Sequence, residues 1–137
     1  MATRARIGIQ LDDNSVLSVY HHWDGYPQWL GRILKTHYNT REQVAELIDG
    51  GDMSSCWSDS IWGENLSEGK YAPEYYSARG EDCPPRLDTI FEFLDKNNNE
   101  EYAYIWTVNN EWKAFDMNAF NDAKPESVEI PEGALAV

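Results

Sequence analysis

The stretch HHWDGYPQWLG at residues 21–31 holds the side chains best suited to chemistry, because it combines two histidines, a carboxylate and two tryptophans. His22 and Asp24 are two positions apart, so in extended backbone their side chains share one face. A carboxylate placed this way orients an imidazole and fixes its tautomer, which makes both residues candidate catalytic groups. The competing interpretation is that Asp24 caps a helix beginning near Pro27, and that His22 is a half-buried strand residue.

Cys56 and Cys83 are the two cysteines of the chain, and each is a candidate nucleophile if the fold brings it to His22 as the base. A lone cysteine is more often a small buried apolar residue. A metal site would draw its ligands from the two cysteines and from His22, His37 and Asp24. Their spacing matches no zinc or calcium pattern, so we predict no metal and no cofactor.

Aromatic side chains give a second kind of candidate site. Tryptophan and tyrosine are favoured anchors at interfaces because they combine a large apolar area with a polar end. The candidate residues for binding a ligand or partner are Trp23, Tyr26, Trp29, Trp57 and Trp62. The alternative is that about half of them fill the core.

Hydrophobic periodicity indicates the elements that must position these residues. Alternating apolar residues predict two hairpins, formed by strands at 5–11 and 16–21 and by strands at 102–108 and 111–117. Helical spacing predicts helices at 27–38, at 40–50 and around 87–94, the second opened by a capping box of Thr40 and Gln43. Residues 52–85 have weak periodicity, with a short strand at 54–58 as the one feature we expect.

This order of elements predicts an α+β fold, with a mainly antiparallel sheet of four to five strands and about three helices covering one face. The length of 137 residues fits a single domain spanning 1–137. Residues 118–137 carry prolines and small side chains, so we expect a loosely packed C-terminal tail.

The formal net charge is −13, and it is concentrated in residues 51–137, which carry 18 acidic and 6 basic side chains. Such a chain has no basic footprint for nucleic acid, and its charge disfavours an anionic membrane surface. The N-terminus lacks an apolar signal block and no apolar run is long enough to span a bilayer, so we expect a cytoplasmic protein with reduced thiols.

Several segments resemble a known family. The opening ATRARIGI and the stretches VYHHWDGYPQWLG, LIDGGDMSSCW and YYSARGEDCPPR resemble uncharacterised small proteins of marine T4-like phages, which have distant relatives in bacteria. The shared motif is Y-x-H-W-D-G-Y-P, which runs from Tyr20 to Pro27 here, and the resemblance covers most of residues 1–115. It implies a phage or marine-microbe origin, with the cytoplasm of the host cell as the location if the protein is phage-encoded, and it supplies no catalytic role.

Three functions compete on these grounds. The first is a small acidic non-enzymatic binding module that contacts a host or phage protein through the aromatic residues of the junction. The second is a small hydrolase-like enzyme with His22 as base and Asp24 as its orienting carboxylate. The third is an acidic mimic of nucleic acid. The sequence alone does not fix the oligomeric state or the identity of the partner.

Overall fold

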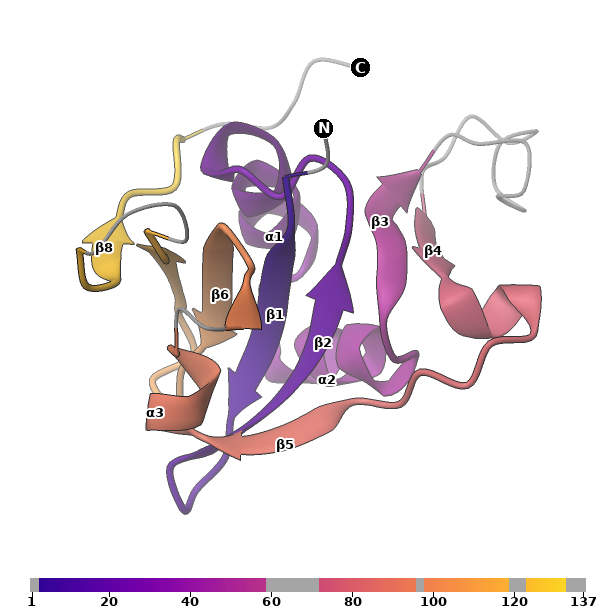
Figure 1. The fold of residues 1–137 in the computed structure, drawn as a ribbon, viewed down its shortest axis with the longest axis horizontal. Coiled ribbons are helices and arrows are strands. Elements are labelled where there is room, and N and C mark those ends of the chain that lie inside the picture. The colour runs from indigo at the N-terminus through magenta and orange to yellow at the C-terminus, as the bar shows by residue number, and fades with distance from the viewer. Residues whose placement is uncertain (1–2, 59–71, 96–97, 119–122, 133–137) are drawn as a thin grey trace.

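A mixed β-sheet with helices on both faces organises the chain (Figure 1). The computed structural model describes residues 3–58, 72–95, 98–118 and 123–132. The strands are β1 (Ala5–Gln10), β2 (Ser15–His21), β3 (Met53–Ser58), β4 (Ala72–Tyr75), β5 (Arg86–Thr89), β6 (Tyr102–Trp106), β7 (Trp112–Asp116) and β8 (Glu126–Val128). Their spatial order is β4-β3-β2-β1-β6-β7-β8, and β5 pairs with β2.

The predicted mainly antiparallel sheet of four to five strands is wrong, because the sheet is mixed and has eight strands within the described residues alone. Strands β1 and β2 are antiparallel and so are β6 and β7, as hairpins require. The two hairpins meet through a parallel pairing of β1 with β6, with Ile7 opposite Tyr104, and β3 lies parallel to β2. Local alternation identifies the strands, but it contains no information about which distant strands become neighbours.

One face of the sheet is covered by a π-helix, η1 (Pro27–Gly31), and by the helices α1 (Arg32–His37) and α2 (Arg41–Asp49). Pro27 suits the first helical position because it has no N–H to leave unpaired. Thr40 Oγ1 accepts a hydrogen bond from the Gln43 N–H, which confirms the predicted cap. The Gln43 side chain reaches back to the N–H of Asn39.

The main core lies between this face and the helices. Alternate residues of the central strands point into it, including Ile7, Val19 and Tyr104, each of which is fully buried. Helix α1 adds Leu34 and helix α2 adds Ile48, also fully buried. Tyr104 also donates a hydrogen bond of 2.6 Å to the backbone carbonyl of Gly25, so its hydroxyl is satisfied inside the core.

The opposite face has its own helix, so the prediction that the helices cover one face is wrong. Helix α3 (Ile90–Phe93) buries Phe93 against a second apolar cluster that includes Val16 and Ile105. Figure 1 shows α3 in front of the sheet and α1 and α2 behind it. The predicted helix at 87–94 is also shorter than expected, because Leu87 belongs to β5 and Thr89 forms the N-terminal cap.

Two glycines with the same φ differ in how closely other backbone approaches them. Gly51 and Gly80 both have φ near +85°, but a Cβ on Gly51 would lie 2.2 Å from the carbonyl oxygen of Cys83, whereas a Cβ on Gly80 would meet nothing within 4 Å. We expect Gly80→Ala to lower the free energy of unfolding by about 1 kcal/mol, the cost of the left-handed conformation. Gly51→Ala should cost more than about 2 kcal/mol, because backbone must also move. Chemical denaturation of the two variants measures the difference. Equal losses in the free energy of unfolding would show that the backbone at Cys83 moves aside at no cost.

No helix in the described parts of the chain combines the length and the apolar character needed to cross a bilayer.

Candidate functional site

The strand-to-helix junction does not assemble the predicted pair of His22 and Asp24. Asp24 is exposed, has φ near +56° and forms no hydrogen bond or ion pair with His22 among the described residues. It does not cap the following helix either, because the N-cap position is Tyr26 and has no side-chain cap. Neither interpretation of Asp24 matches its position.

His22 follows the end of β2 and instead pairs with Tyr20, which lies two residues earlier on that strand. The Tyr20 hydroxyl is 2.7 Å from His22 Nδ1, and burial raises the pKa of Tyr20 to about 12, so the phenol keeps its proton at neutral pH. When this hydroxyl donates to Nδ1, a neutral His22 carries its proton on Nε2 and offers a donor to solvent. This arrangement does not favour His22 as a general base.

The neighbouring His21 is a framework residue. It is fully buried, and its Nε2 accepts a hydrogen bond of 2.8 Å from the backbone N–H of Cys56. Burial lowers the pKa of His21 to about 3, so the ring is neutral in the folded protein. His21 and His22 therefore point to opposite faces of the sheet, one into the core and one outward.

The structure does not bring the two cysteines to His22 in a reactive form. Both are free thiols. Cys56 is fully buried, and burial raises its pKa to about 12, which keeps the thiol protonated and unreactive. Partial burial and nearby carboxylates, first that of Asp52, raise the pKa of Cys83 as well. Across the described ranges, no group of three or more His, Cys, Asp or Glu residues is placed to hold a metal.

Of the predicted aromatic residues whose side chains the structure describes, Trp23 alone is largely exposed. Trp23 is 47% exposed and stacks edge-on against His22 with ring centroids 4.6 Å apart. Trp29 packs against the main core and Tyr26 is half-buried. Trp57 belongs to β3, but its side chain lies outside what the structure describes, and so does the whole of Trp62.

A buried ion pair joins Arg6 of β1 to Glu100, which lies just before β6. Arg6 Nε is 3.4 Å from Glu100 Oε1, and both residues are buried. Burial lowers the pKa of Arg6 and raises that of Glu100. The carboxylates of Asp52 and Asp88 act on Arg6 as well, and Asp88 pairs with the nearby Arg86. The arginines of this cluster are thus balanced by carboxylates, which suits a structural network that holds the loop before β6 rather than an anion site.

A groove opens on the other side of the molecule, where β7 and the chain after β8 diverge. Pairing between them ends at Ala114 opposite Val128. Beyond this point Ile130 leaves the sheet and packs against the main core. Its side chain occupies space next to Gly31, where a Cβ would lie 3.1 Å from Ile130 Cγ2. The C-terminal segment, expected to be loosely packed, thus contributes both a strand and one wall of this groove.

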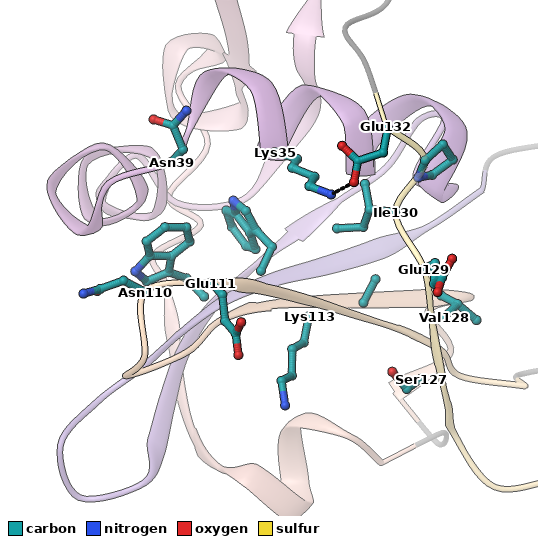
Figure 2. A pocket seen from close by; sticks show the side chains of 14 residues that line it. Lys35, Asn39, Asn110, Glu111, Lys113, Ser127, Val128, Glu129, Ile130 and Glu132 are labelled. Atoms are coloured by element: carbon teal, nitrogen blue, oxygen red, sulfur yellow. Dashed lines mark hydrogen bonds and ion pairs between the residues drawn. The ribbon is translucent and has the colours of Figure 1, made fainter.

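We call this space the Trp112 groove (Figure 2). It has a volume of about 680 Å³, within the range of ligand sites in proteins, and is lined by Lys35, Asn39, Trp106 and residues 110–114 and 127–132. Lys35 reaches down from α1 and forms an ion pair of 2.7 Å with Glu132 on the facing wall.

Two tryptophans fix one end of the groove. The rings of Trp106 and Trp112 are edge-to-face with centroids 5.5 Å apart, and the Trp112 indole N–H donates to the carbonyl of Tyr38 at 2.7 Å. This contact holds the Trp112 ring against the loop between α1 and α2. The groove therefore has a rigid aromatic surface, as binding anchors do.

The backbone of Trp112 lacks a strand partner on the groove side. The N–H of Thr107 bonds to the carbonyl of Glu111, so the ladder between β6 and β7 uses the backbone groups of odd-numbered residues of β7. Even-numbered residues then face the β8 edge, where Ala114 meets Val128 but Trp112 meets no described strand. This leaves a free sheet edge inside the groove.

The prediction of a loosely packed tail at residues 118–137 misses this groove. The available signal was the alternation of Val128 and Ile130 just before Pro131, which indicates a short edge strand that ends abruptly.

No family model, curated protein or solved structure matches this chain. The resemblance to phage proteins stays a prediction.

Proposed function

We propose that this chain is a non-enzymatic binding module that holds an extended segment of a partner protein in the Trp112 groove. The observation that carries the proposal is the free edge at Trp112 within a groove of about 680 Å³. An extended segment completes such an edge with main-chain hydrogen bonds, and its side chains occupy the pockets on either side.

The contents of the groove favour a peptide over catalysis. The described lining holds tryptophan, aliphatic, proline, amide, lysine and glutamate side chains and one serine, with no histidine or cysteine among them to activate it. A hydrolase at His22 has less support, because Tyr20 occupies His22 Nδ1 and Asp24 does not orient the ring. The two free thiols suit the cytoplasm, which the phage resemblance would make that of the host cell.

Amide hydrogen exchange followed by NMR tests this proposal. In the free chain, we expect the Trp112 amide to exchange at least about tenfold faster than the Ala114 amide, which is paired with Val128. Heptapeptides selected from a random display library against the full chain should slow Trp112 exchange by a similar factor.

Trp23→Ala supplies the control, because Trp23 is the exposed aromatic residue of the junction and lies outside the groove. The variant should bind the selected peptides as the unmodified chain does. A library that yields no binder, or binders that leave Trp112 exchange unchanged and lose affinity in Trp23→Ala, would overturn the proposal.

A further inference from the structure

We infer that the partner segment alternates apolar with basic residues, and that its basic side chains meet Glu111 and Glu129 at the rim of the Trp112 groove. The inference rests on the proposed function, because it assumes an extended segment along the free edge at Trp112. It adds the chemical class of the partner.

The alternation follows from the two faces that the groove presents. Successive side chains of an extended segment point to opposite faces of the sheet. One face, toward α1, offers the apolar side chains of Trp112 and Ile130, next to the ion pair in which Lys35 and Glu132 neutralise each other. Figure 2 shows the side chains of Glu111 and Lys113 on the other side of the strand, away from Lys35 and Ile130. A bound segment therefore meets apolar side chains and a neutralised ion pair on one face, and charges outside that pair on the other.

The groove lining carries a net negative charge once its ion pair is set aside. Lys35 is neutralised by Glu132 at 2.7 Å. The remaining charged residues of the lining are Glu111, Glu129 and Lys113, which leaves one excess negative charge. The whole chain, groove included, has a formal net charge of −13, which attracts cationic partners and repels anionic ones over long range.

Three matched peptides test the inference, each acetylated and amidated: Arg-Ile-Arg-Ile-Arg-Ile-Arg and the same sequence with Gln or Glu in place of Arg. We expect the Arg peptide to bind at least about fivefold more tightly than the Gln peptide at low salt, and the Glu peptide to bind most weakly. Binding is measured by titration calorimetry, and its location by protection of the Trp112 amide.

Protein variants separate the groove from the overall charge. The double variant Glu111→Gln/Glu129→Gln should reduce the preference for Arg over Gln by about threefold or more. Glu126→Gln is the control, because Glu126 is exposed on β8 and outside the groove, and it should leave the preference nearly unchanged.

The outcomes distinguish the inference from the function on which it rests. If the Gln peptide protects Trp112 and the Arg peptide binds no more tightly, the inference is wrong and the proposed function stands. A preference for Arg that survives the double variant unchanged also overturns the inference, because the rim carboxylates would then not cause it. If none of the three peptides protects Trp112, both are wrong.

Discussion

Phe93→Ala is expected to lower the free energy of unfolding by about 3–5 kcal/mol, the usual cost of removing a buried aromatic ring. Phe93 is 1% exposed and forms the centre of the cluster between α3 and the sheet. The ring also lies where Gly8 has no side chain, since a Cβ there would be 2.9 Å from Phe93 Cε1. Neighbouring side chains cannot easily collapse into the space it leaves, which places the expected cost high in this range.

Phe91→Ala is the matched control for this prediction. Phe91 belongs to the same short helix but is 85% exposed, so its replacement should change stability by less than about 0.5 kcal/mol. Urea denaturation of both variants, followed by tryptophan fluorescence, measures the two changes. Equal effects for Phe91 and Phe93 would mean that α3 does not pack on the sheet through Phe93.

The burial of Phe93 and the exposure of Phe91 are the reverse of what the apolar spacing predicts. The spacing of Leu87, Ile90, Phe91 and Leu94 predicts a helix with Phe91 on its buried face. Helix α3 instead begins at Ile90, because Thr89 and Glu92 form a reciprocal capping box, and this turns Phe93 inward. The capping signal of Thr89 and Glu92 is present in the sequence, but the prediction rests on the apolar spacing alone.

Local features were predictable because their causes are local. The hairpin of β1 and β2 follows from alternation, with a turn in which Asn14 adopts φ near +66°. The cap at Thr40 follows from its spacing to Gln43. Each of these depends on contacts within a few residues, which the sequence displays directly.

The parallel pairing of β1 with β6 and the Trp112 groove both depend on contacts between residues that are far apart in the sequence. Ile7 and Tyr104 become neighbours only when the two hairpins dock. The groove exists because Ile130 packs near Gly31 instead of continuing along β7, and these two residues are separated by most of the chain. The alternation of Val128 and Ile130 before Pro131 indicates a short edge strand, but no periodicity shows which strand it pairs with, so the groove was not predictable from the sequence.

The second large effect is expected at His21, through the dependence of stability on pH. The folded pKa of His21 is about 3, against 6.5 for an unperturbed histidine, because burial disfavours the charged ring. Between these values the unfolded state binds more protons than the folded state, so stability falls as pH decreases. We expect His21 to remove about 2–3 kcal/mol between pH 7 and pH 4.5.

His21→Gln isolates this contribution, because the amide oxygen retains an acceptor for the Cys56 N–H and does not titrate. Asp and Glu residues titrate in both proteins, so the difference between their pH–stability curves reports His21 alone. The difference should grow as pH falls from 7 to 4.5, with the unmodified chain losing more stability. A flat difference curve for His21→Gln would mean that His21 is not held neutral, and that the junction is open to water where the structure shows it closed.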